Sequence, residues 1–344
     1  MEVPSIFLNR ILSDLVQKNG SDLHLAVGSP PMVRINNQFV SSSSQEMLTN
    51  EMINKITETF LEPDEIVNLK RTKGVVLVKN ISNFRFRINV FYQKKLLAAS
   101  FHYIPGAIKS FKDLGLAEVC SNFLSVTSGL LIVAGVYNSG KTTTAAALIE
   151  ELNKTKTLNI VTIEDPIEYL FISKTSLIMQ RQIATDVNTV ADALDYCLSE
   201  DVDVVYLNEI KDNKVFNLVL PKIFELASGN CLVILEINAD SSARVLEKIL
   251  AGASVNFPAE AARYNLADIL AGVLVQKLVK RRGGGLVLAN EILLNNAAAK
   301  SLIREGKIYQ LESVIQTSRK EGMISMGKSL NNLIEAGKIR REDI

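Results

Sequence analysis

Histidine, cysteine and tryptophan are scarce in this chain of 344 residues, which has two histidines, three cysteines and no tryptophan. The cysteines, Cys120, Cys197 and Cys231, show no C-x-x-C spacing, so neither a four-cysteine zinc element nor a disulfide framework is expected. Because His24 and His102 are the only histidines, a histidine-rich metal site is not expected either. We interpret the cysteines as small buried thiols in a reducing compartment.

A strong net charge and long apolar runs are also absent. The chain has 38 Lys and Arg against 37 Asp and Glu, a net charge of +1, so no overall field attracts nucleic acid or anionic lipid. Its longest apolar runs, at 129–134 and 232–237, are much shorter than the roughly 20 residues that span a bilayer. The opening MEVPSIFLNR lacks the basic start of a secretory signal. These absences predict a cytoplasmic protein that does not bind nucleic acid.

The composition that is present predicts a folded chain with two domains. A hydrophobic share of 47% with 22% charged residues is typical of a chain with a large interior, and the length suits two domains of roughly 100–200 residues each. The first domain is expected at 1–104 as a smaller α+β unit. Apolar residues spaced by three and four along 8–15 predict a helix that ends at Gly20. Strands and a hairpin are expected at 21–40, and a helix at 50–61.

Residues 84–90 alternate strictly between apolar and polar side chains. The polar positions include Arg85 and Arg87, so the pattern predicts a strand with one apolar and one basic face. A second strand, expected at 96–104, would pair with it. The domain ends near a Pro-Gly pair, and we place a linker at 105–111.

The remainder, 112–344, is expected to be an α/β domain followed by C-terminal helices. Short apolar runs alternate with helical stretches, which predicts a largely parallel sheet flanked by helices. The expected strands lie at 130–134, 158–163, 202–207, 231–237 and 286–294, and the expected C-terminal helices at 297–304 and 327–335.

A phosphate-binding loop is the most specific local motif in the chain. Residues 135–142, GVYNSGKT, match G-x-x-x-x-G-K-[ST] and lie between a predicted buried strand and a predicted helix at 143–152. Backbone N–H groups of such a loop surround the phosphates, and the helix N-terminus adds partial positive charge. We therefore expect ATP and Mg²⁺ as cofactors, with Lys141 reaching the β- and γ-phosphates and Thr142 ligating Mg²⁺. The predicted nucleotide-binding residues of this segment are Gly135, Asn138, Ser139, Gly140, Lys141, Thr142 and Thr143.

Acidic residues follow two of the predicted strands. Glu164 and Asp165 end the strand at 158–163, and Glu209 follows the strand at 202–207. Ligands of parallel sheets lie outside the carboxyl ends of the strands, so these acids are expected to face the phosphate loop. Phosphoryl transfer to water requires a held metal ion and an oriented water. We predict all three acids as catalytic, with Glu164 as a Mg²⁺ ligand and Glu209 as the base that orients the water.

Several motifs together resemble one family. They are SDLHL at 21–25, GSPPMVR at 28–34, NFRFRIN at 83–89, the phosphate loop, EDPIE at 164–168 and LIRE at 302–305. In this order, over nearly the whole chain, they are similar to the PilT-type retraction ATPases of the secretion ATPase superfamily. The resemblance implies a PAS-like N-terminal domain joined to a RecA-like P-loop ATPase domain.

The same resemblance implies a hexameric ring that powers type IV pilus retraction and twitching motility. Glu164 and Asp165 would serve the metal and the water, and Arg85 and Arg87 would reach the nucleotide across the domain junction. The implied partners are further copies of this chain, an inner-membrane pilus platform protein and the pilus base, and another pilus ATPase is an alternative partner. The implied location is cytoplasmic and peripheral at the inner membrane, through the pilus machinery.

Departures from the family pattern leave a second function open. The family's motif G-H-L-V-x-x-T-L-H-T corresponds to residues 229–239 here, which contain Asn230 and Asn238 and no histidine. In the family's motif F-R-x-I-P, the arginine is replaced by His102. Basic positions are also replaced by Asp195 and Ser199. The alternative to an active motor is therefore a weakly active or inactive paralogue that binds nucleotide as an accessory subunit. A nucleotide kinase or a nucleic-acid motor has less support, because no acceptor-binding pattern or large basic patch is present.

Overall fold

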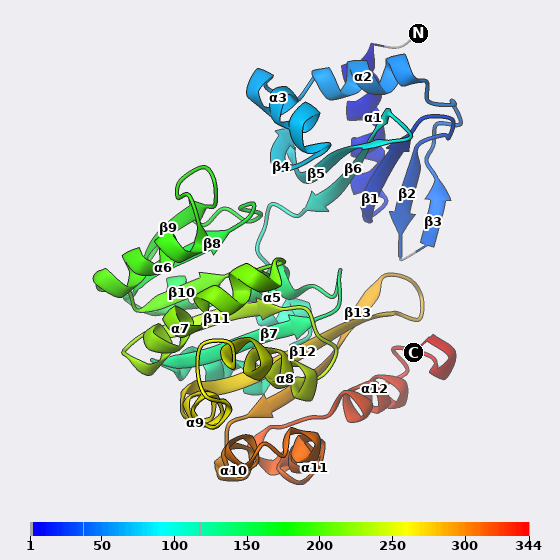
Figure 1. The fold of residues 1–344 in the computed structure, drawn as a ribbon. Coiled ribbons are helices and arrows are strands. Elements are labelled where there is room, and N and C mark those ends of the chain that lie inside the picture. Colours follow the sequence, from blue (N-terminus) through cyan, green and yellow to red (C-terminus); the bar gives the residue numbers. More distant parts are fainter. Residues whose placement is uncertain (1–2, 37, 117, 344) are drawn as a thin grey trace. The chain divides into compact units, whose positions relative to one another are not determined.

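The computed structural model describes residues 3–36, 38–116 and 118–343, and the chain divides into two compact units, Met1–Ala107 and Ile108–Ile344 (Figure 1). Within those described ranges, no helix combines the length and the apolar character needed to cross a membrane. The architecture confirms the predicted α/β class, in which a smaller α+β unit precedes the α/β unit along the chain.

The first unit is a six-stranded antiparallel sheet in the order β3-β2-β1-β6-β5-β4. Its strands are β1 (Gly20–Ala26), β2 (Met32–Ile35), β3 (Gln38–Ser41), β4 (Gly74–Ile81), β5 (Phe84–Gln93) and β6 (Leu96–Ile104). Its helices are α1 (Pro4–Gln17), α2 (Asn50–Glu58) and α3 (Pro63–Thr72). Helix α1 ends at Gln17, earlier than the predicted end at Gly20, because Gly20 is already the first residue of β1. A Cβ at Gly20 would lie 2.4 Å from Leu15 Cδ1.

Alternation along β5 determines which face of this sheet is covered. Phe86, Ile88 and Val90 are fully buried and share one core with residues of α1, α2 and α3. Arg85 and Arg87 alternate with them and therefore lie on the opposite face. The strand predicted at 84–90, with one apolar and one basic face, is confirmed.

The second unit is built on a seven-stranded sheet in the order β13-β12-β7-β11-β10-β8-β9. Every neighbouring pair is parallel except β12 and β13, which are antiparallel. The strands are β7 (Gly129–Gly135), β8 (Asn159–Glu164), β9 (Leu177–Gln182), β10 (Val204–Leu207), β11 (Leu232–Ile237), β12 (Leu270–Lys280) and β13 (Leu286–Leu294). The predicted largely parallel sheet is confirmed, and β9 and β12 were not predicted.

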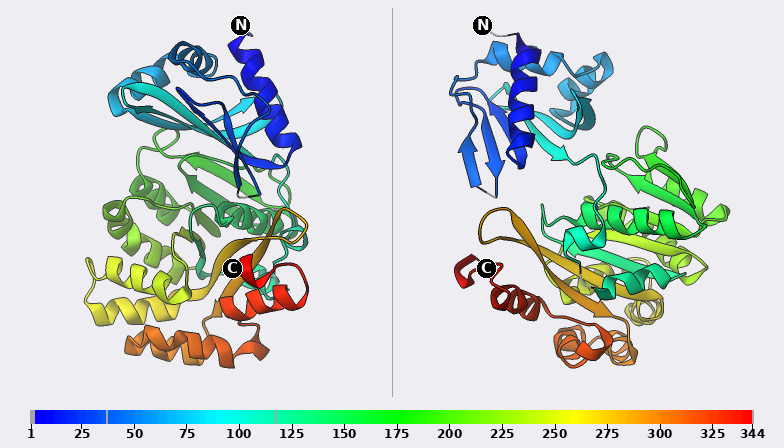
Figure 2. Two further views of the ribbon diagram at one scale, coloured as in Figure 1. Left: turned by 90° about the vertical axis from the view of Figure 1, so that its right-hand side faces the viewer. Right: turned by 180° about the vertical axis from the view of Figure 1, so that it is seen from behind.

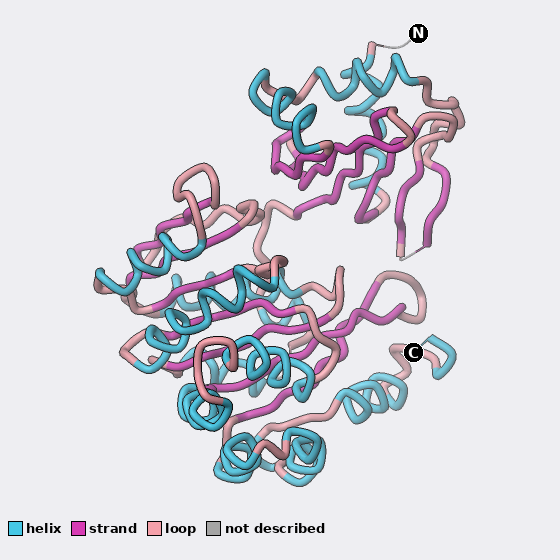
Figure 3. Tube along the Cα trace, viewed as in Figure 1, coloured by secondary structure: helices cyan, strands magenta, loops and turns pink. Residues whose placement is uncertain are grey.

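Strands and helices alternate through most of this unit (Figure 3). The α-helices are α4 (Phe111–Leu114), α5 (Lys141–Thr155), α6 (Val190–Ser199), α7 (Asn213–Ser228), α8 (Ser242–Ala253), α9 (Ala259–Ile269), α10 (Ala297–Glu305), α11 (Leu311–Thr317) and α12 (Met326–Glu335). Short 3-10 helices are η1 (Glu118–Ser125), η2 (Ile308–Gln310), η3 (Arg319–Glu321) and η4 (Arg341–Asp343). Near the end of the chain, α12 packs on β13 (Figure 2).

Two apolar cores lie on opposite faces of the sheet because successive strand residues point to opposite sides. Alternate residues of the central strands pack with α6 to α11 in one core. The others, including Tyr206 of β10 and Ile234 of β11, pack with α5 and η1 in the second core. The helix that follows the phosphate loop thus lies on the same side of the sheet as Tyr206.

Candidate nucleotide-binding site

The phosphate loop occupies the turn between β7 and α5. Gly135 ends the strand, and a Cβ there would lie 2.2 Å from Ser139 Oγ and 2.7 Å from the Gln276 carbonyl oxygen. Asn138 and Gly140 have positive φ values of 59° and 88°, the region that asparagine and glycine tolerate best. Gly135, Asn138 and Gly140 therefore suit the shape of this turn, which leads directly into the N-terminus of α5.

Lys141 is the first residue of α5 and lies within this turn rather than extending into solvent. Its side chain is 7% exposed, and its Nζ donates to the carbonyl oxygens of Gly135 at 3.0 Å and Val136 at 3.2 Å. The same ammonium lies 3.4 Å from Glu209 Oε2. The structure therefore brings Glu209, the predicted base that follows β10, directly to the predicted phosphate-binding lysine.

The residues of the loop fit a nucleotide with Mg²⁺. The hydroxyl of Ser139 is buried without a hydrogen-bond partner among the described residues. Ser139 lies just before the N-terminus of α5, and anions bind at helix N-termini. The hydroxyl oxygen of Thr142 lies 3.3 Å from a carboxylate oxygen of Glu236, and oxygen is the ligand atom that Mg²⁺ prefers. In the described part of the chain, no group of three or more His, Cys, Asp or Glu residues is arranged to hold a metal alone.

Glu164 ends β8 but makes its hydrogen bonds away from Lys141. Its Oε1 accepts from Thr162 Oγ1 at 2.7 Å and from Gln180 Nε2 at 3.2 Å. Burial raises the pKa of the Glu164 carboxyl from 4.5 to about 7. Asp165, the next residue, is exposed. Of the three predicted acids, Glu209 contacts the phosphate loop, through its ion pair with Lys141.

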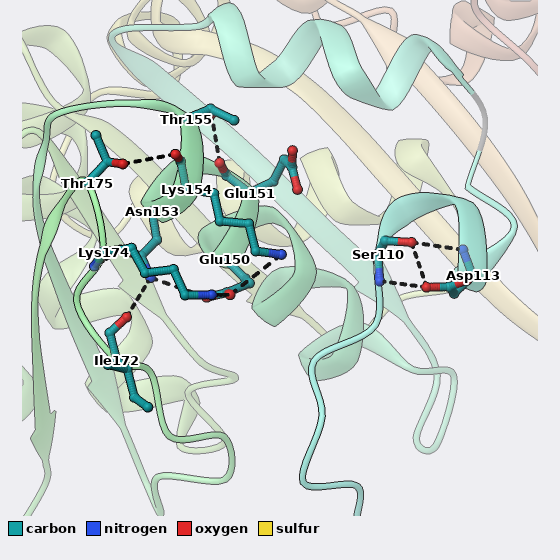
Figure 4. A network of polar contacts seen from close by, with 10 residues as sticks. All are labelled: Ser110, Asp113, Glu150, Glu151, Asn153, Lys154, Thr155, Ile172, Lys174 and Thr175. Atoms are coloured by element: carbon teal, nitrogen blue, oxygen red, sulfur yellow. Dashed lines mark hydrogen bonds and ion pairs between the residues drawn. The ribbon is translucent and has the colours of Figure 1, made fainter.

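Side-chain contacts attach the segment after β8 to helix α5. Near the start of the helix, the hydroxyls of Thr143 and Tyr169 are 3.1 Å apart. Near its end, Asn153 Nδ2 donates to the carbonyl oxygen of Ile172 at 2.9 Å, and Lys174 forms an ion pair with Glu150 (Figure 4). The segment that follows β8 is therefore held against α5 near both ends of this helix.

A fourth acid, Glu236, belongs to the site although the sequence interpretation gave it no role. It lies in β11 and is fully buried, and its Oε2 accepts from Thr142 Oγ1 at 3.3 Å. Its Oε1 accepts from the hydroxyl of Tyr206 at 2.6 Å. Burial raises the pKa of the Glu236 carboxyl to about 7. The available signal was a single acid inside an otherwise apolar strand, LVILEI.

The other residues named from the sequence lie in three further places. Arg85 and Arg87 lie on β5 of the first unit. In the same unit, His102 Nδ1 lies 2.9 Å from Asp22 Oδ1, because β1 and β6 pair these two residues in register. In the second unit, Asp195 forms an ion pair with Lys222.

Buried acids make stability depend on pH, and Glu164 gives the clearest test. Between about pH 4.5 and 7 the folded chain keeps a proton on Glu164 that the unfolded chain releases, so unfolding becomes more favourable as pH rises. Without nucleotide or divalent cation, Glu164→Gln should therefore be more stable than the parent above pH 7, by on the order of 3 kcal/mol. The advantage should disappear near pH 4. Denaturant unfolding of both proteins above pH 7 and near pH 4 measures this stability difference. A difference that does not change with pH would contradict the prediction.

Comparisons with known proteins match nearly the whole chain. Residues 3–333 match the family model described as type II/IV secretion system protein. The chain is 33% identical to the type IV pilus retractation ATPase PilT of Pseudomonas aeruginosa, over 98% of this chain and 96% of that protein. It is 32% identical to a twitching motility protein of Neisseria gonorrhoeae, over 97% of this chain and 88% of that protein.

A solved structure agrees with these sequence matches. It is described as the pilus retraction motor PilT with bound ADP, and it superposes with a TM-score of 0.80 at 32% identity. The match covers 98% of this chain and 95% of that chain. The fold and the sequence similarity therefore extend over both units.

Proposed function

Because this chain belongs to the type II/IV secretion system protein family and is an ATPase of the PilT-like kind, we propose that it powers type IV pilus retraction and twitching motility. The relatives named as a retractation ATPase and a twitching motility protein favour the motor over the accessory subunit. The observation that carries the proposal is the position of Lys141, buried in the phosphate loop and 3.4 Å from Glu209.

ATP with Mg²⁺ supplies the phosphoanhydride bond and the cationic charge that neutralises its oxygens. In the proposed mechanism, Lys141 exchanges its contacts with Glu209 and the loop carbonyls for contacts with the β- and γ-phosphates. The loop N–H groups and the N-terminus of α5 hold the phosphates in place. Thr142 and Glu164 would hold the metal, and Thr143, Asn138 and Ser139 would line the nucleotide.

Glu209 then becomes free to act on water. Its carboxylate would orient the water and accept the proton that the water loses on attack at the γ-phosphate, and ADP would leave. Asp165, the exposed residue directly after β8, would help Glu164 to serve the metal and the water. In the proposed ring, Arg85 and Arg87 of the first unit contribute positive charge to the nucleotide. Charge of this kind stabilises phosphoryl transfer.

The proposed assembly is a hexamer on the cytoplasmic face of the inner membrane. The proposed partners are the pilus platform protein, the pilus base and, as an alternative, another pilus ATPase. Binding of nucleotide in each subunit would close one unit against the other, and closure around a ligand is a common way to couple binding to movement.

Phosphate release and particle size together test the proposed function. The purified full chain should release phosphate from ATP in Mg²⁺, lose this activity in chelator, and elute as a hexamer in light-scattering analysis. An accessory subunit would bind nucleotide but release no phosphate alone. A monomer without Mg²⁺-dependent phosphate release would contradict the proposal.

A further inference from the structure

Glu236 is an acidic residue in a strand of the second unit that is buried along its whole length. Strand β11 lies between β7 and β10, and all six of its residues are buried. The other five are Leu232, Val233, Ile234, Leu235 and Ile237. Placing a carboxylate in such a strand costs free energy unless polar partners compensate it. Packing alone therefore gives no reason for an acid at this position.

The register of the sheet places this acid beside the phosphate-loop strand. Glu236 pairs with Val133 of β7, two residues before the loop begins at Gly135. Its side chain lies on the same face of the sheet as Tyr206 and α5, since Tyr206 Oη donates to Glu236 Oε1 at 2.6 Å. The second oxygen, Oε2, accepts from Thr142 Oγ1 at 3.3 Å. The carboxyl thus links β10 to the hydroxyl predicted to ligate Mg²⁺.

Glu236 is better placed than Glu164 to act through Thr142. In P-loop ATPases, the metal is held by the loop Ser or Thr together with an acid from a neighbouring strand. The hydrogen bonds of Glu164 run to Thr162 and Gln180. Those of Glu236 run to Thr142 itself and to Tyr206.

We propose that Glu236 is the positioning residue of the metal site, orienting the Thr142 hydroxyl and placing negative charge behind Mg²⁺, with Tyr206 fixing the carboxylate. This inference rests on the proposed function, because it concerns the metal of the same nucleotide site. Outer groups that orient a metal ligand typically change metal affinity by about 10–100-fold. Glu236 should therefore affect how much Mg²⁺ strengthens nucleotide binding, more than nucleotide binding itself.

Calorimetric titration with ADP in Mg²⁺ and in EDTA separates these two effects. For Glu236→Gln, ADP affinity in EDTA should stay within about threefold of the parent. The Mg²⁺ gain, meaning the factor by which Mg²⁺ increases ADP affinity, should fall by about 10–100-fold. Tyr206→Phe should shift the gain in the same direction by a smaller factor. Glu291→Gln is the matched control, because Glu291 is also buried but accepts from the Ser242 amide. It should leave the gain unchanged.

The outcomes distinguish the inference from the function it rests on. Equal losses of ADP affinity in Mg²⁺ and in EDTA for both Glu236→Gln and Tyr206→Phe would show a structural role and overturn the inference. An unchanged Mg²⁺ gain in Glu236→Gln would overturn it as well, with the proposed function intact. A parent chain that binds no ADP would overturn both. Thermal melting of each variant checks that it is folded during the titration.

Discussion

ATP hydrolysis by the Lys141→Ala variant should be about 10²–10³-fold slower than by the parent, the usual loss when one preorganised transition-state donor is removed. Lys141 is the buried cation of the phosphate loop, and in the structure it already lies among carbonyl oxygens and Glu209. Without it, charge on the transferring phosphoryl group is less neutralised, and Glu209 loses its ion-pair partner. Nucleotide affinity should decrease as well. A phosphate-release assay and a nucleotide titration measure the two losses.

Lys156→Ala is the matched control for this variant. Lys156 is exposed at the opposite end of the same helix, α5, so its removal should change neither hydrolysis nor binding by more than about twofold, as expected for a surface substitution away from the site. If Lys141→Ala keeps at least half of the parental rate, then the phosphate loop does not act in hydrolysis as described.

The Glu209→Gln variant should separate binding from hydrolysis. Its turnover should fall by about 10²–10⁴-fold, the range for loss of a general base. Its ATP affinity should stay equal to the parent or increase, because Lys141 no longer forms an ion pair that the phosphates must replace. Turnover at saturating ATP and a titration with a non-hydrolysable ATP analogue measure the two quantities.

Glu225→Gln provides the comparison for loss of an acid elsewhere. Glu225 is exposed on α7, and its substitution should leave both turnover and affinity unchanged. Parallel losses of turnover and affinity in Glu209→Gln would mean that this acid supports nucleotide binding, and the role of base would then pass to another residue.

Patterns within one short segment were the reliable part of the sequence interpretation. The phosphate loop predicts its own strand, turn and helix, because Gly135 and Gly140 have the positive φ values of that turn, and Lys141 bonds back to the Gly135 carbonyl oxygen. The alternation at 84–90 likewise predicts a half-buried strand. Even so, α5 begins at Lys141 rather than at residue 143, since the periodicity of side chains does not show where the backbone turns helical.

Two elements of the first unit were missed although part of the signal was local. Helix α3 begins with Pro63 and has a capping box between Glu62 and Glu65, which is a helix-start pattern. Strand β4 follows it directly and is only partly buried along most of its length, so its apolar pattern is weak. The pairing of His102 with Asp22 depends on the register of β6 against β1, and register is a property of the assembled sheet.

The acid at Glu236 shows why the rest of the site could not be predicted from spacing. Thr142, Tyr206 and Glu236 are far apart in the sequence, and they meet because β11 lies between β7 and β10. The order of strands in a sheet does not follow from the order in the chain. For Glu164, the position at the end of a strand predicts that the side chain faces the phosphate loop. In the structure its hydrogen-bond partners are Thr162 and Gln180.

The most direct test of the central claim is a calorimetric titration of the full-length chain with a non-hydrolysable ATP analogue in Mg²⁺. Saturable binding of one nucleotide per chain, much weaker in Lys141→Ala and retained in Glu209→Gln, is the predicted result. A parent chain that shows no heat of binding at millimolar analogue, a range in which even weak sites of about 1 mM affinity are half filled, would contradict the claim.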